Sequence, residues 1–232
     1  RYMSMLFTRD DFGDAFRWGV STAAYQVEGA HDADGKGPSI WDDFVKRRRK
    51  IHNGDHGNQA CNHYHRYTED LALIYNLHIP NYRFSISWSR IFPNGTGAPN
   101  PEGVAFYHRV IDACLQRGIT PWITIYHWDL PQALEDKGGW TNRDTSYLFA
   151  EYAASVHDAL GDRVTAWTTL NEPWCASFLS YIGGEHAPGR QDPAAGLAAS
   201  HHLLLAHGMA VQELRSRDSS LQLGITLNLT VA

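Results

Sequence analysis

The sequence predicts an α/β fold: a parallel sheet closed into a (βα)8 TIM barrel, of which this chain supplies the first four βα units and the fifth strand. Strand-like and helix-like segments alternate along the 232 residues, which is typical of a parallel sheet. The strand-like segments are mostly apolar, as expected for strands covered on both faces. Polar residues accompany successive strands at a regular spacing, which indicates one functional group per unit.

The first two units occupy the first half of the chain. An apolar segment at residues 16–22 predicts the first strand, and after a long Gly-rich loop the amphipathic residues 67–77 predict its helix. Residues 81–87 predict the second strand. Apolar side chains then recur at helical spacing over residues 104–116, and Gly118 supplies the helix stop.

The remaining elements follow in the same order. Residues 120–126 predict the third strand and residues 145–160 its helix. Residues 164–170 predict the fourth strand and residues 194–215 a long fourth helix, and residues 221–229 begin a fifth strand. Because no Pro, Gly or Ser linker marks a boundary, we expect one domain over the whole chain.

Polar side chains lie within or just beyond the carboxyl ends of the predicted strands. Gln26 accompanies the first strand, and Arg83, His127 and Glu172 are separated by 44 and 45 residues. In a barrel these strand ends surround one pocket. A doubly wound sheet also fits the alternation, but a dinucleotide-binding sheet needs GxGxxG after its first strand, and no such segment occurs. The spacing therefore favours the barrel.

Composition and charge narrow the range of partners. Twenty basic and 25 acidic residues give a formal net charge of -5, the wrong sign for a nucleic-acid partner. No apolar run reaches the roughly 20 residues of a membrane-spanning helix, and the first residues lack a signal-peptide core, so we expect a cytoplasmic protein. Three scattered cysteines predict neither a disulfide framework nor a zinc site. We expect a small neutral partner and no metal or cofactor.

Four segments carry a resemblance to a known family. They are FRWGVSTAAYQVEG at residues 16–29, YRFSISW at residues 82–88, HWDLP at residues 127–131 and TLNEP at residues 169–173. In content and order they resemble the signatures of glycoside hydrolase family 1, the retaining β-glycosidases. Lesser segments agree with them: residues 37–42, residues 63–67 and Trp140. The resemblance implies that residues 1–232 form the N-terminal half of a single catalytic barrel.

The resemblance assigns the central chemistry to Glu172. Glycoside hydrolysis needs a carboxylic acid that protonates the departing oxygen, and in the retaining mechanism the same carboxylate later acts as a base on water. The family's acid/base corresponds to Glu172, and Asn171 corresponds to the residue that binds the sugar 2-hydroxyl. The alternative for Glu172 is a salt bridge at the end of a strand.

The resemblance also implies sugar contacts outside the acid segment. Gln26 and His127 correspond to ligands of the 3- and 4-hydroxyls, with Trp128 as an aromatic neighbour. Arg83 corresponds to the residue that keeps the nucleophilic carboxylate ionised, and an internal ion pair in the barrel is the alternative, compatible with that role. Asn228, near the end of the fifth strand, is a further candidate for the pocket.

Other signals favour structural explanations. The irregular spacing of the histidines among residues 52–65 argues against a metal site, and we expect the basic residues 46–50 to form a solvated surface. We expect Asp129 to be structural and Cys175 to serve in packing. The sequence departs from the family pattern at Asn62 and at residues 78–81, which concerns local packing.

The family's nucleophile, a Glu in a Thr-Glu-Asn-Gly segment, does not occur in these residues. We therefore expect a complementing C-terminal half that supplies it. With that half, the resemblance implies a retaining β-glucosidase acting on terminal β-D-glucosyl residues of cello-oligosaccharides or aryl and alkyl glucosides. Two alternatives remain: a non-catalytic sugar-binding half-barrel and a 6-phospho-β-glycosidase.

Overall fold

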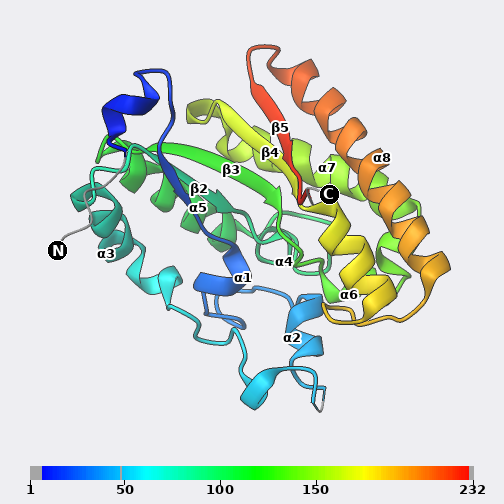
Figure 1. Cartoon of the computed structure of the whole chain (residues 1–232). Coiled ribbons are helices and arrows are strands. Elements are labelled where there is room, and N and C mark those ends of the chain that lie inside the picture. The colour runs from blue at the N-terminus through cyan, green and yellow to red at the C-terminus, as the bar shows by residue number, and fades with distance from the viewer. Residues whose placement is uncertain (1–6, 48, 230–232) are drawn as a thin grey trace.

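A five-stranded parallel sheet forms the centre of the computed structural model, which describes residues 7–47 and 49–229 (Figure 1). Neighbouring strands pair in the order β1-β2-β3-β4-β5, which is also their order in the sequence. A doubly wound sheet would reverse direction at a switch point, and this order does not. The strands are β1 (Gly19–Ser21), β2 (Asn81–Ser85), β3 (Thr120–Tyr126), β4 (Ala166–Asn171) and β5 (Gln222–Thr226).

Four long helices return the chain from one strand to the next and cover the outer face of the sheet (Figure 1). Pro101 opens the second of them, where its missing N–H costs nothing, and the Asp192 carboxylate caps the last by accepting from the N–H groups of Ala194 and Ala195. These helices are α3 (His63–Asn76), α5 (Pro101–Leu115), α7 (Asp144–Leu160) and α8 (Pro193–Arg217).

Short helices lie in the loops that follow the strands, and the sequence did not predict them. In Figure 1 the short α-helices gather at the end of the sheet where the strands finish. The α-helices are α1 (Ala24–Val27), α2 (Ile40–Phe44), α4 (Trp88–Ile91) and α6 (Gln132–Glu135), and a π-helix spans Cys175–Gly183. Single 3-10 turns occupy Arg9–Phe12, His52–Gly54, Gly139–Thr141 and Gly161–Arg163.

The two faces of the sheet differ in chemistry. Ile123 and Trp167, which pair in register, are fully buried in the hydrophobic core with residues of the long helices. The opposite face is polar: Trp122 donates from Nε1 to Thr168 Oγ1 at 2.9 Å across β3 and β4. One face therefore forms the core against the helices and the other lines the barrel interior.

Exposure rises from the middle of the sheet to its edges. All six residues of β4 are buried, whereas β1 and β5 contain no buried residue. The first and fifth strands are also shorter than the predicted ranges, because β1 covers only Gly19–Ser21 and β5 only Gln222–Thr226. Within the described residues, each of these strands extends only as far as it pairs with its one neighbouring strand. No helix among the described residues is long and apolar enough to cross a membrane.

Candidate active site

Three predicted site residues meet at the carboxyl ends of β2, β3 and β4. Arg83 donates from Nη2 to Asn171 Oδ1 at 2.6 Å and from Nε to the hydroxyl of Thr124 at 2.7 Å. Trp128 donates from its indole Nε1 to the backbone oxygen of Asn171 at 2.7 Å. Parallel register brings these residues together although they are far apart in the sequence. The result is one hydrogen-bonded unit at the barrel mouth.

Glu172 follows β4 in an unusual backbone conformation. Its φ is 49°, in the left-handed region that non-glycine residues adopt only at a cost of about 1 kcal/mol. Its N–H donates to Thr226 O at 2.8 Å, and its own carbonyl accepts from the N–H of Ala176 at 3.1 Å. These bonds to β5 and to the following helix hold the strained turn, and the side chain of Glu172 is half-buried.

Burial and neighbouring charges shift the pKa values of the two basic side chains, His127 and Arg83. Burial, together with the charge of Arg83, lowers the pKa of His127 to about 4, so the imidazole is neutral at neutral pH. Its Nδ1 is buried and has no hydrogen-bond partner among the described residues. Burial also lowers the pKa of Arg83, while the charge of Glu172 acts in the opposite direction. His127 can thus donate or accept one hydrogen bond to a neutral ligand.

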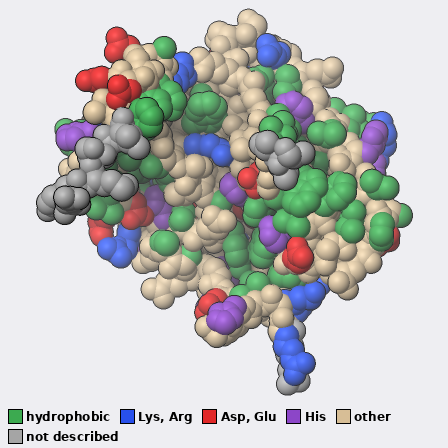
Figure 2. All heavy atoms as spheres, viewed as in Figure 1, with side chains coloured by type: hydrophobic (Ala, Val, Ile, Leu, Met, Phe, Trp, Pro, Cys, Tyr) green, Lys and Arg blue, Asp and Glu red, His purple; other side chains and the backbone are tan. Residues whose placement is uncertain are grey.

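A cavity of about 450 Å³ opens beside His127. Gln26, His127 and Trp128 all line it. Gln26 is exposed on α1 and makes no side-chain hydrogen bond within the described part of the chain, so its amide is free to bind a ligand. Figure 2 shows acidic, basic and histidine side chains close together near the middle of this face, bordered by hydrophobic ones.

Aromatic side chains that the sequence analysis did not single out complete the cavity wall. The rings of Tyr25 and Trp41 stack with centroids 5.9 Å apart, and His186 lies 5.0 Å from Trp128. Such rings suit the apolar C–H faces of a sugar. Tyr25 adjoins Gln26 and Trp41 lies in a family-like segment, so both could have been found, whereas nothing in the sequence indicated His186.

Arg83 faces a different space from that of the sugar-binding candidates. It lines a cavity of about 250 Å³ on the barrel-interior face, together with Trp122, Asn81 and Ser21. Neither Asn171 nor Glu172 lines either cavity. The structure therefore places the predicted residues in two adjoining groups, with Trp128 in contact with both.

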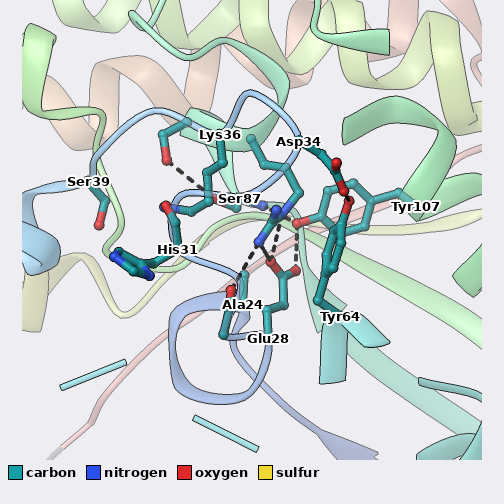
Figure 3. A network of polar contacts seen from close by, with 12 residues as sticks. Ala24, Glu28, His31, Asp34, Lys36, Ser39, Tyr64, Ser87 and Tyr107 are labelled. Atoms are coloured by element: carbon teal, nitrogen blue, oxygen red, sulfur yellow. Dashed lines mark hydrogen bonds and ion pairs between the residues drawn. The ribbon is translucent and has the colours of Figure 1, made fainter. Parts of the chain in front are cut away.

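A buried polar network supports the loops behind the cavity (Figure 3). Glu28 accepts from Arg90 Nε at 3.0 Å and from the Tyr107 hydroxyl at 2.6 Å. Asp42 accepts from the Lys36 ammonium at 3.2 Å and from the N–H of Ser39 at 2.7 Å. The bonds of Glu28 tie the end of α1 to α4 and α5, and the bonds of Asp42 hold the segment leading into α2 against that helix. Both sets of bonds support the loops that carry Gln26 and Trp41.

Comparison with known proteins identifies the family. A model described as glycosyl hydrolase family 1 matches residues 8–232. The chain belongs to glycosyl hydrolase family 1. Beta-glucosidase A of Acetivibrio thermocellus is 52% identical over 219 residues, covering 94% of this chain and 49% of the relative. A bifunctional beta-D-glucosidase/beta-D-fucosidase of Bifidobacterium breve is 45% identical, covering 99% of this chain and 50% of the relative.

Solved structures agree with this assignment. Beta-glucosidase from Thermotoga maritima in complex with castanospermine superposes with a TM-score of 0.92 at 49% identity, covering 93% of this chain and 49% of that one. A psychrophilic beta-glucosidase from Micrococcus antarcticus gives 0.91 at 55% identity, covering 93% and 45%. The predicted fold class is confirmed, and the five strands belong to a partial (βα)8 barrel. The chain spans about half the length of the curated relatives it matches.

In this family 1 chain, Asp129 lies apart from the sugar-binding candidates. It is 2% exposed and borders a cavity of only about 10 Å³, together with Ser87 and Asp42. Burial raises the pKa of Asp129 to about 7, and the charge of Glu28 contributes in the same direction. Its environment is that of a structural residue behind the wall of the larger cavity.

The other residues discussed in the sequence analysis lie at separate places in the structure. His63 contacts Asp70 at 2.6 Å, and His56 lines the large cavity. Arg47 and Lys50, from the predicted solvated surface, bind the carbonyls of Pro188 and Gly184 and so fasten one loop to another. Asn228 donates from Nδ2 to the sulfur of Cys175 at 3.3 Å and does not line the large cavity.

Proposed function

We propose that this chain is the acid/base half of a retaining β-glycosidase that hydrolyses terminal β-D-glucosyl residues. The observation that carries the proposal is the position of Glu172, which follows the end of β4 in a strained turn, next to Asn171 and close enough to Arg83 for its charge to act on the guanidinium. Related chains are named beta-glucosidases, which supports the reaction class. The remaining barrel strands come from further residues, and we call the two parts together the completed barrel.

The proposed reaction has two steps. In the first, Glu172 gives its proton to the glycosidic oxygen as the bond from that oxygen to the anomeric carbon breaks. A nucleophilic carboxylate outside this chain bonds to the anomeric carbon and forms a glycosyl-enzyme. In the second, the Glu172 carboxylate removes a proton from water, whose oxygen displaces the nucleophile and releases the sugar. The two carboxyl groups then lie about 5 to 5.5 Å apart.

Arg83 supports a nucleophile from outside these residues. Within the described part of the chain it makes no salt bridge: its hydrogen bonds go to neutral oxygens of Asn171 and Thr124, and the charge of Glu172 acts on it without direct contact. A half-buried guanidinium usually has an anionic partner. A carboxylate across the barrel mouth would provide that partner and would be kept ionised by it.

The cavity supports a neutral sugar as the ligand. We propose that Gln26 and His127 bind the 3- and 4-hydroxyls, that Trp128 borders the ring, and that Asn171 binds the 2-hydroxyl. The residues found to line the cavity include no Lys or Arg, and Asp55 is among them. This lining suits a neutral sugar ring, whereas the phosphate of a 6-phospho-β-glycoside would be bound by residues of the second half.

A sugar-binding half-barrel without catalysis is the second candidate. It is favoured by the same observation that requires a second half: the recognised signatures in this chain include an acid but no nucleophile segment. The mass of the intact native protein separates the candidates. A lone species near the chain's 26.1 kDa favours the binder, and about double that mass favours the enzyme.

Glu172→Gln in the completed barrel tests the proposal. The amide keeps the shape of the side chain but has no proton to transfer, so kcat/KM for phenyl β-D-glucoside and cellobiose should fall about 10² to 10⁴-fold. The dinitrophenyl glucoside, whose leaving group departs without protonation, should lose far less. Hydrolysis of cellobiose at the parent rate would show that Glu172 is not the acid.

A further inference from the structure

The Glu172 carboxyl has a neighbour with an unassigned role. The thiol of Cys175 lies 3.5 Å from Glu172 Oε2 and is the only hydrogen-bond donor found for that carboxyl within the described residues. On its other side, the Cys175 sulfur accepts from Asn228 Nδ2 at 3.3 Å. A chain of two contacts thus runs from the segment after β5, through the thiol, to the carboxyl group.

The location of Cys175 makes this contact well defined. It is 3% exposed and is the first residue of the π-helix that begins directly after the Glu172 turn. Ser180 donates to the carbonyl of Cys175 at 3.2 Å, and Ser177 donates to the carbonyl of Pro173 at 2.6 Å, which satisfies carbonyls along this wide helix. π-Helical segments are rare and often occur at functional sites.

The direction of the hydrogen bond between Cys175 and Glu172 follows from the protonation state of the thiol. Burial raises the pKa of the Cys175 thiol, so the sulfur keeps its proton and S–H is the donor. Because Oε2 accepts from this donor, a proton on Glu172 is disfavoured at Oε2 and falls on Oε1. The carboxyl group then has one oxygen held by the protein and one free to exchange a proton.

We propose that Cys175, oriented by Asn228, is a positioning residue that reserves Oε1 of Glu172 for proton exchange with the glycosidic oxygen and with water. This inference rests on the proposed acid/base role of Glu172. Cys175 does not touch the substrate in this scheme. It fixes the carboxyl rotamer in both steps, since a weak S–H donor can hold either the protonated or the ionised group.

Two substitutions at Cys175 separate hydrogen bonding from packing. Cys175→Ser keeps a donor but removes volume, whereas Cys175→Val keeps volume but removes the donor. In the completed barrel, Cys175→Val should lower kcat/KM for phenyl β-D-glucoside about 10-fold, a fraction of the roughly 10² to 10⁴-fold that acid catalysis contributes. With the dinitrophenyl glucoside the loss should stay within about 3-fold, and Cys175→Ser should remain within about 3-fold on both substrates.

Matched control variants accompany this experiment. Cys114 is fully buried in α5 and has no hydrogen bond to the site, so Cys114→Val and Cys114→Ser report the general cost of changing a buried thiol. Asn228→Ala tests the contact from its other side without altering the helix, and it should change the ratio of the two substrates in the same direction as Cys175→Val. If Cys175→Val does not fold, Asn228→Ala still tests the proposed contact.

The outcomes distinguish the positioning role of Cys175 from the acid/base role of Glu172 on which it rests. A substrate ratio unchanged in Cys175→Val and Asn228→Ala, or a loss in Cys175→Ser as large as in Cys175→Val, would overturn the positioning role. If Glu172→Gln itself leaves the substrate ratio unchanged, the acid/base assignment fails instead. A change in Glu172→Gln and in Cys175→Val, with none in the Cys114 variants, supports both.

Discussion

His127 shows how burial at a single residue prepares a side chain for a neutral ligand. Its Nδ1 is buried and unpartnered within the described residues, and its pKa is lowered to about 4 by burial and by Arg83. A neutral imidazole avoids a second positive charge beside Arg83 and can still exchange hydrogen bonds with a hydroxyl. The unpartnered nitrogen costs stability unless a ligand or water occupies it.

We therefore predict that His127→Ala weakens catalysis by loss of a sugar contact. In the completed barrel kcat/KM for glucosides should fall by an amount equivalent to about 2 to 4 kcal/mol, because a buried hydroxyl loses its partner in the transition state. His201→Ala, at an exposed position of α8, is the matched control. Steady-state kinetics showing an unchanged kcat/KM in His127→Ala would exclude the contact.

At the scale of elements, several residues at or near the ends of strands and helices adopt the strained left-handed backbone conformation. Trp128 and Glu172 adopt φ values of 77° and 49° immediately after strand ends, where the chain turns into the site. Asn62 and His78, where the sequence departs from the family pattern, also have positive φ, at 57° and 54°. Asn and His are enriched in this region, so these two departures fit the local backbone.

Asp129, in the loop after β3, should make stability depend on pH. Its folded pKa of about 7 exceeds the 3.8 of a free side chain, so between these values the folded protein binds the proton more tightly. The free energy of unfolding should therefore fall as pH rises from about 4 to 7. Asp129→Asn, which cannot ionise, should match the parent near pH 4 and exceed it by roughly 1 to 4 kcal/mol at pH 8.

Denaturant unfolding of the completed barrel across this pH range measures the effect. Asp14→Asn, at an exposed position, controls for the loss of one carboxylate from the surface. A difference between Asp129→Asn and the parent that stays constant from pH 4 to pH 8 would contradict the raised pKa.

The long elements could be predicted from the sequence because their periodicity is strong. The strands and the helices α3, α5, α7 and α8 lie close to the predicted ranges. The short helices were missed, since segments of four or five residues gain their stability from tertiary contacts that a local pattern does not report. The π-helix Cys175–Gly183 was missed because its spacing differs from 3.6 residues per turn.

The candidate site was only partly predictable for a related reason. Gln26, Arg83, His127 and Glu172 stand out because each is a polar residue near the end of an apolar strand. His186 lies in a loop far along the chain, and only the folding of that loop against Trp128 brings it to the cavity. The link from Cys175 to Glu172 likewise depends on helix geometry that the sequence does not display.

At the scale of the whole molecule, the exposed edges indicate an unfinished barrel. β1 and β5 each pair with one neighbour among the described residues, and neither contains a buried residue. Leu197 and Leu204 are 63% and 53% exposed on α8, although this helix packs against α7 on its other side. Open strand edges and exposed apolar residues are liabilities in an isolated domain. They fit a partial barrel, in keeping with the 49% of a solved relative that this chain covers.

The central claim is that this chain supplies the acid and other residues supply the nucleophile. Trapping the completed barrel with a 2-deoxy-2-fluoro-β-glucoside and mapping the labelled peptide by mass spectrometry tests it most directly, because the fluorine slows release of the covalent intermediate. We predict a stable adduct of one sugar on a Glu outside residues 1–232. Attachment to Asp129, Glu172 or any other residue of this chain would contradict the account.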